Sequence, residues 1–222
     1  MRKFRLVCFR KAVFISLASF LFTAAAALAA SDAPETPARF SYSIDARNFT
    51  VTRDAVKLEA PQDGMLRVAP RARGSVVWTH FPLPEESRGH REWIVTASVG
   101  ASAGAGGGVG MWYDDGGYVL LLFPDGNGYM RYYDGKSVLW SAEVKAANFA
   151  WPARLSLVRD VNGSVTGRVD DAIVGARLLP VDLKRRALPK VKSLSFVTQN
   201  LPGTNSGYAL YEKLDAEAYG AK

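Results

Sequence analysis

Carboxylates recur near the C-terminal end of the chain, where Glu212, Asp215 and Glu217 lie within six residues. Hydrolysis of a glycosidic bond needs two carboxyl groups held about 5–10 Å apart on either side of the bond. Because alternate residues of a strand share a face, Asp215 and Glu217 should lie together with Tyr211, while Glu212 faces the other way with Leu214. The spacing therefore indicates a final strand with a solvated polar face rather than a catalytic acid–base pair.

Thiol and imidazole groups are scarce. Cys8 is the single cysteine of the sequence, and His80 and His90 are its two histidines, in separate segments. Neither a thiolate metal site nor a paired-histidine site can be built from them, so we expect no transition metal. Oxygen ligands around Asp125 and Asn127 leave calcium as an alternative, but the segment lacks a full ligand series and we expect no cofactor.

Aromatic residues are the stronger candidates for chemistry, since the sequence has five tryptophans and nine tyrosines. The apolar face of a sugar ring packs on a flat aromatic ring whose edges remain hydrated. Trp112 alternates with Gly108 and Gly110 and precedes Asp114, so a ligand could approach bare backbone beside the indole. We expect Trp78, Trp93 and Trp151 to pack in the core.

A second candidate set lies in the next predicted hairpin. Tyr129, Arg131 and Tyr133 share one face of a strand and Met130 lies on the other, so the arginine marks the first face as solvent-accessible. The predicted ligand-binding residues are therefore Trp112, Asp114, Tyr129, Arg131 and Tyr133.

The elements that must position these residues are strands. Short apolar or alternating runs recur about every ten residues from Phe49 onward, separated by turns such as Asp125-Gly126-Asn127-Gly128. Residues 118–123 are apolar on both faces, which predicts a strand in the middle of a sheet. The best helical candidate is a turn or two near residues 181–188. The pattern predicts an all-β sandwich of two antiparallel sheets.

The order of these motifs resembles the concanavalin A-like lectin/glucanase superfamily, including its laminin G-like and 3-keto-disaccharide hydrolase-type domains. The resemblance covers residues 45 to 219. The matching residues are Gly108, Gly110, Gly117, Tyr118, Trp151, Leu155, Leu157, Gly163, Val169 and Asp170. It implies a jelly roll of two curved sheets, often with carbohydrate at the concave one and sometimes with calcium at its rim. Acidic strands of the hydrolases and the motifs of the lyases on this fold have no counterpart here.

The first 29 residues have the layout of a secretory signal peptide. Five basic residues are followed by an apolar run that ends in the small residues Ala27 and Ala29. We expect cleavage near Ala29, export to the periplasm or outside the cell, and no stable membrane insertion afterwards. An uncleaved membrane anchor is the alternative, although the run is shorter than the ~20 apolar residues of a spanning helix.

Removing this segment changes the charge that matters for function. Five of the 28 basic residues lie in it, which leaves 23 basic against 21 acidic residues and a net charge of about +2. A nucleic-acid partner therefore loses its electrostatic support.

The sequence thus predicts a signal peptide at 1–29, a polar tail at 30–44 and one β-sandwich domain at 45–222. We expect the domain to bind a glycan or glycan-derived ligand without cleaving it. A glycoside-active hydrolase or lyase with an unrecognised site, and a structural or protein-binding domain of the cell envelope, are the alternatives.

Overall fold

The alternating runs form strands and the glycine-rich segments between them form turns, as the sequence predicts. The computed structural model describes residues 39–45, 56–62, 64–134, 136–178 and 188–220, all within the compact unit Pro37–Lys222. The predicted signal peptide, the predicted strand at 49–52 and most of the helical candidate at 181–188 lie outside these residues. Among the described residues, no helix is long and apolar enough to cross a membrane.

The strands are β1 (Phe40–Asp45), β2 (Val56–Gln62), β3 (Met65–Pro70), β4 (Val76–Pro82), β5 (Glu92–Ala103), β6 (Ala105–Trp112), β7 (Gly117–Leu122), β8 (Asn127–Tyr133), β9 (Val138–Lys145), β10 (Ala153–Arg159), β11 (Ser164–Val169), β12 (Ala172–Leu178), β13 (Ser193–Asn200) and β14 (Tyr208–Tyr219). A short 3₁₀ helix, η2 (Glu85–Ser87), follows β4.

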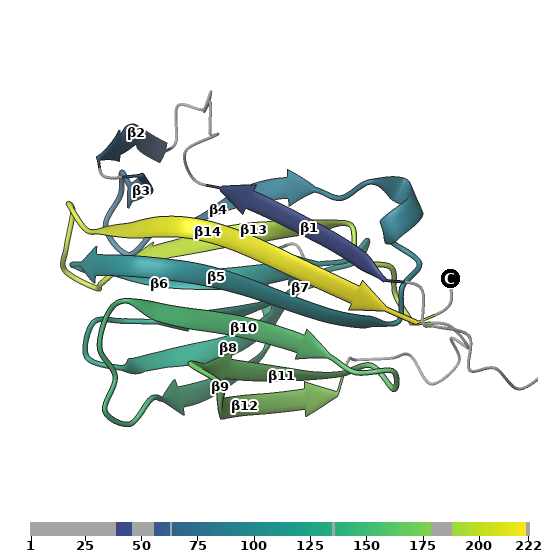
Figure 1. Ribbon diagram of the computed structural model, residues 1–222. Coiled ribbons are helices and arrows are strands. Elements are labelled where there is room, and N and C mark those ends of the chain that lie inside the picture. The colour runs from purple at the N-terminus through teal and green to yellow at the C-terminus, as the bar shows by residue number, and fades with distance from the viewer. Residues whose placement is uncertain (1–38, 46–55, 63, 135, 179–187, 221–222) are drawn as a thin grey trace, which may run out of the picture. The chain divides into compact units, whose positions relative to one another are not determined.

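Two antiparallel sheets stack face to face (Figure 1). One runs β12-β11-β10-β5-β14-β3-β2, with β1 also paired to β14, and is called the eight-stranded sheet here. The other runs β4-β13-β6-β7-β8-β9 and is called the six-stranded sheet. The predicted all-β sandwich is therefore confirmed, and β7, the strand predicted to lie mid-sheet, is buried along its whole length.

The core lies between the sheets and is made of one residue in two from each strand. Trp93 and Val95 of β5, Leu155 of β10, Phe196 of β13 and Tyr211 of β14 belong to it. The residues between them face outward, so each sheet has one face in the core and one outer face.

The N-terminal part of the domain differs from the prediction. Residues 40–45 form β1, which pairs in register with residues 213–218 of β14, although residues 40–44 were assigned to the tail at 30–44. The apolar residues Phe40, Tyr42 and Ile44 alternate and pack against the core, a pattern that the sequence analysis passed over because polar residues surround it. The domain therefore begins before residue 45.

The face assignment in β14 also needs correction. The pairing of β14 with β5 shifts its register around Tyr211, so that Tyr211 and Leu214 both face the core. Strict alternation had placed Tyr211 beside Asp215 and Glu217. A β-bulge changes which residues share a face, and a sequence pattern of period two cannot include it.

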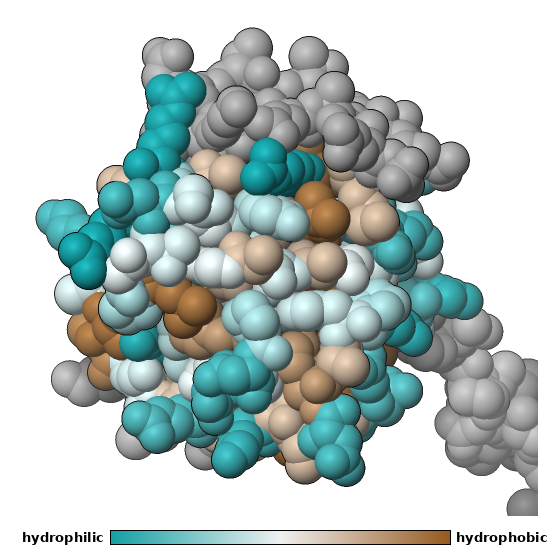
Figure 2. Space-filling model, turned by 90° about the vertical axis from the view of Figure 1, so that its left-hand side faces the viewer, coloured by the Kyte–Doolittle hydropathy of each residue, from teal (hydrophilic) through white to brown (hydrophobic). Residues whose placement is uncertain are grey.

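The described residues at the end where β5 turns into β6 present no large apolar area. In Figure 2, which looks onto the left-hand side of Figure 1, hydrophilic and neutral residues make up most of the coloured surface, with small separate hydrophobic spots. A contiguous docking patch would be larger. The outer faces of the two sheets are the remaining surfaces that a ligand could reach.

Candidate functional site

The outer face of the six-stranded sheet, called the aromatic face below, holds a second cluster of apolar residues that is separate from the core. Its buried members are Trp112, Val119, Leu121, Tyr129, Tyr133 and Val197. Val119, Leu121 and Val197 are wholly inaccessible to solvent although they lie on an outer face. A layer of larger side chains therefore covers the middle of this face.

Trp78 and Tyr133 show how this layer is built. They lie on β4 and β8, four strand positions apart, which in a flat sheet would separate the strands by roughly 19 Å. Their ring centroids are nevertheless only 5.6 Å apart, in an edge-to-face contact. Two aromatic side chains cannot span that gap on a flat sheet, so the aromatic face is concave and its rings meet above the central strands.

Trp112 belongs to the part of this layer that lies directly on the sheet backbone, beneath Trp78. Its indole Nε1 donates a hydrogen bond of 2.8 Å to Ser195 Oγ, and Trp78 and His80 contact the ring edge-on. Side chains added to Gly110 or Gly117 would collide with the indole, so the ring lies flat over these two glycines.

Trp112 is therefore not the exposed platform that the sequence suggested. Only 8% of it is accessible, and the indole itself covers the glycine backbone that was expected to be bare. The physical reason is that glycines in neighbouring strands leave room for a large ring to lie down on the sheet. Whether Trp112 touches a ligand stays a prediction.

Tyr129 lies across the same face from the other side. Its hydroxyl donates a 2.5 Å hydrogen bond to Gln199 Oε1 on β13, three strand positions away, and the residue is 5% exposed. Burial raises the pKa of this phenol above its usual range. Tyr129 therefore stays neutral and forms part of the layer of aromatic side chains that covers the aromatic face.

Arg131 stacks on the ring of Tyr129. Its guanidinium carbon lies 3.6 Å from the centroid of the Tyr129 ring, and its Nε donates a 3.1 Å hydrogen bond to Ser141 Oγ on β9. The contacts hold the guanidinium flat against the ring, at the edge where the aromatic face becomes solvent-accessible.

A groove of about 530 Å³ opens beside these two residues, over β8 and β9. It is called the groove below. It is lined by Phe123, Asn127, Gly128, Tyr129, Arg131, Ser141, Glu143, Val144 and Lys145. Aromatic and aliphatic surface forms part of its wall, and amide, hydroxyl and charged groups form the rest, which is the composition of a small-ligand site.

The five predicted site residues are thus distributed unevenly. Tyr129 and Arg131 line the groove, and Tyr133 and Trp112 lie in the aromatic layer beside it. Asp114 lies in the turn after β6, where it forms an ion pair with Lys192. It does not line the groove.

Sequence reasoning missed several residues of this face. Trp78 was expected in the core but lies on the outer face and is 36% exposed. Ser141, Glu143 and Lys145 alternate along β9 and could have been found by the same parity argument that identified Arg131. Gln199 could not, because its partnership with Tyr129 depends on which strands are neighbours.

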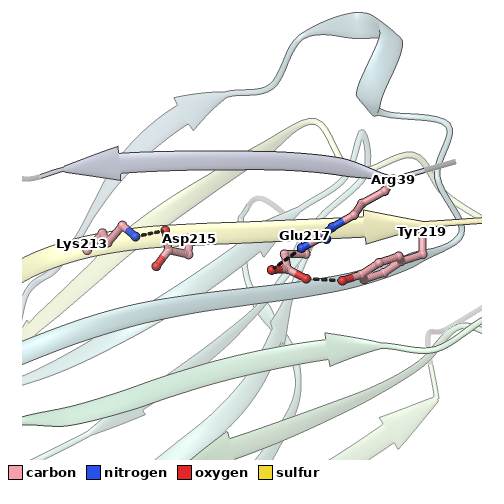
Figure 3. Close-up of polar contacts among 5 residues, drawn as sticks. All are labelled: Arg39, Lys213, Asp215, Glu217 and Tyr219. Atoms are coloured by element: carbon pink, nitrogen blue, oxygen red, sulfur yellow. Dashed lines mark hydrogen bonds and ion pairs between the residues drawn. The ribbon is translucent and has the colours of Figure 1, made fainter.

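The outer face of the eight-stranded sheet holds the acidic residues of β14. Lys213 pairs with Asp215 at 2.8 Å, and Arg39 pairs with Glu217 at 3.2 Å, as drawn in Figure 3. Tyr219 donates a hydrogen bond to Glu217 and thereby lowers the pKa of that carboxyl group, with a smaller contribution from Arg39. A general acid needs a raised pKa, so Glu217 is organised as a structural ion-pair partner of Arg39 and not as a proton donor.

Metal ligands do not gather in the part of the chain that the structure describes, where no group of three acidic, histidine or cysteine side chains could hold an ion. The carboxylate of Asp125 accepts hydrogen bonds from the backbone and side-chain nitrogens of Asn127, at 3.1 and 2.8 Å. These bonds lower the pKa of Asp125 and complete a local turn. The predicted alternative of calcium at this turn therefore gains no support from its geometry.

Comparisons with known proteins identify the fold. No family model and no curated protein matches the chain. A β-1,3-1,4-glucanase (lichenase) from a mouse hindgut metagenome matches with a TM-score of 0.51 and 10% identity, over 81% of this chain and 98% of that one. A protein of unknown function with a galectin-like fold from Bacillus subtilis gives 0.53 and 12%, over 85% and 99%.

A third similar structure is the CBM2 module of the evolved Dit of Lactobacillus casei BL23 phage J-1, with a TM-score of 0.50 and 13% identity, over 84% of this chain and 99% of that one. At these identities the likeness is one of fold. The chain has the concanavalin A-like jelly-roll fold that the sequence motifs predicted.

Proposed function

We propose that this protein binds a glycan in the groove and does not cleave it. The observation that carries the proposal is the juxtaposition of a buried, immobilised Tyr129 with a stacked Arg131 at the edge of a concave face. Similarity to the lichenase, which by its name acts on a glucan, supports a saccharide ligand for a site on this fold.

The lining of the groove suits a sugar for a chemical reason. A pyranose has apolar faces and a rim of hydroxyl groups, each of which both donates and accepts hydrogen bonds. Phe123 offers apolar surface, the Arg131 guanidinium stacked on Tyr129 offers a flat face, and Asn127, Ser141 and Glu143 offer polar groups at the wall. Such a mixture holds a sugar ring from its face and its edge together.

The placement of the carboxylates supports binding without hydrolysis. Glu143 is the one carboxylate among the described residues that line the groove, whereas hydrolysis uses two. Asp215 and Glu217 lie on the eight-stranded sheet, in ion pairs. Neither alternative, an enzyme or a structural envelope domain, is supported by a comparable arrangement of the described side chains.

The direct test is a glycan-array screen of the exported form, followed by calorimetry on the best ligand. Arg131→Ala should weaken binding by about 1.5–3 kcal/mol, because a charged donor at the site is lost. Arg154→Ala, on the outer face of the eight-stranded sheet, is the matched control and should change nothing. Equal losses in both variants, or none in either, would contradict the assignment to this groove.

Catalysis is tested separately, by analysing the products after long incubation of the bound glycan with excess protein. We expect the glycan to be recovered intact. Shortened or modified products that disappear in Asp215→Asn or Glu143→Gln would support the enzyme alternative instead.

We further propose that residues 1–29 are a signal peptide that is removed on export to the periplasm or beyond. The basic start, the apolar run and the small residues Ala27 and Ala29 support this. Mass spectrometry of the exported protein should find a new N-terminus near residue 30. Exported protein that still carries Met1 would refute cleavage.

A further inference from the structure

Arg131 is held in place before any ligand binds. Tyr129 packs against one side of its guanidinium at 3.6 Å, and Ser141 accepts from its Nε at 3.1 Å. Tyr129 is fixed in turn by its hydrogen bond to Gln199. A guanidinium anchored by its ring face and by Nε loses little conformational entropy when its remaining nitrogens bind a ligand.

The positive charge of Arg131 has no ion-paired carboxylate among the described residues, and the contacts of its guanidinium are with Tyr129 and Ser141. Lys145 lines the same groove without an ion pair there, although its charge also acts on the carboxylate of Asp125. Glu143 lines the groove as well, and the described residues show no ion pair between it and Arg131. The groove therefore presents a fork of N–H donors and a second cation next to an apolar floor.

This donor set fits a planar anion better than a hydroxyl group. Two parallel N–H groups of a guanidinium match the two oxygens of a carboxylate in a bidentate hydrogen bond. A neutral sugar alone gives no reason for an arginine that is stacked and anchored but unpaired, since amides and hydroxyls serve hydroxyl groups equally well.

We propose that the groove selects an acidic saccharide, in which the carboxylate of a uronic acid unit binds the fork of Arg131. Lys145 adds a second favourable charge, the sugar ring packs on Phe123 beside the stacked Arg131, and Glu143 disfavours a second anion at the same position. This inference rests on the proposed glycan-binding function and names the class of glycan.

Pairs of ligands that differ in charge alone test the proposal. Oligosaccharides of galacturonic, glucuronic, mannuronic and guluronic acid are each compared by calorimetry with the neutral oligosaccharide that carboxyl reduction makes from them. The wild-type exported protein should bind at least one acidic member about tenfold or more tightly than its neutral counterpart, because a bidentate charged pair is lost on reduction.

Three variants make the test specific to Arg131. Arg131→Lys keeps the charge but removes the fork, and it should lose most of the preference for the acidic member. Glu143→Gln removes a like charge and should strengthen binding of that member several-fold, and Arg154→Lys is the control outside the groove. Unchanged melting temperatures show that the variants remain folded.

The outcomes separate the inference from the function on which it rests. Equal binding of acidic and reduced ligands, or an undiminished preference in Arg131→Lys, overturns the selection of acidic sugars while glycan binding stands. If the array finds neutral glycans alone, the inference fails in the same way. If neither the array nor the paired ligands bind, the proposed function itself fails.

Discussion

Trp112 lies flat on Gly110 and Gly117 and is bonded to Ser195, which makes it a structural residue of the aromatic face. Its replacement by alanine should lower the free energy of unfolding by about 3–5 kcal/mol, because a large cavity forms beneath Trp78. Urea denaturation measures this loss. Trp78→Ala, in which a ring with 36% exposure is lost, should cost clearly less. The same small loss in both variants would show that Trp112 is not packed as described.

Single residues show both what a sequence pattern can predict and where it stops. Parity along β8 was enough to place Tyr129, Arg131 and Tyr133 on one face, and the structure confirms that placement. Parity could not show that Trp112 is covered, because its burial depends on glycines and a serine in three different strands. Parity likewise could not predict that Arg131 stacks on Tyr129, because the stacking depends on the direction of the two side chains.

At the scale of the strands, β6 depends on its glycines. A Cβ atom on Gly110 would lie 2.3 Å from Ser195 Oγ and 2.7 Å from Trp112 Nε1. Gly110→Ala should therefore break the hydrogen bond between these two side chains and destabilise the domain by about 1–3 kcal/mol. Thermal or urea unfolding measures the change.

Gly167→Ala in β11 is a suitable comparison for that variant. The nearest atoms to its added Cβ are the flexible side chains of Met130 and Leu120, at 3.3–3.5 Å, so the loss of stability should be smaller. A Gly110→Ala protein as stable as the wild type would mean that the indole does not lie over β6.

Strand existence was predicted better than strand boundaries. The alternating runs of β10 and β11 were recognised with their buried faces, because both strands have polar outer residues. The segment that forms β1 was assigned to a tail because prolines and charges precede it. The bulge in β14 was invisible because hydrogen bonding to β5, and not the sequence of β14, decides where alternation is interrupted.

At the scale of the whole molecule, buried tyrosine hydroxyls make the stability of the folded state depend on pH in the alkaline range. Burial raises the pKa of Tyr113, Tyr129 and Tyr211 above the value near 10 of an exposed tyrosine. The folded state therefore holds these protons more tightly than the unfolded state does. The contribution to stability is complete below about pH 10 and is lost as the pH rises beyond it.

We expect the domain to unfold cooperatively above about pH 10, with tyrosinate absorbance from these three residues appearing together with the loss of near-ultraviolet circular dichroism. Ionisation of all nine tyrosines near their ordinary pKa, in a protein that keeps its circular dichroism signal, would contradict the burial described here.

The overall topology was predictable as a class and not in detail. Turn spacing and the family resemblance predicted two antiparallel sheets, which the structure and its structural neighbours confirm. Which strands are neighbours depends on contacts between distant segments, such as β5 with β14 and β6 with β13. The concavity of the aromatic face follows from those contacts, and so does the groove.

The measurement that tests the central claim most directly is nuclear magnetic resonance mapping of the isotopically labelled protein with the tightest glycan from the array. The account predicts that backbone and side-chain signals of residues 127–131 and 141–145 shift first and most, together with the guanidinium Nε signal of Arg131. Signals of Ser43, Thr96, Asp215 and Glu217 on the opposite sheet should stay in place. Shifts confined to that opposite face, with the groove unchanged, would contradict it.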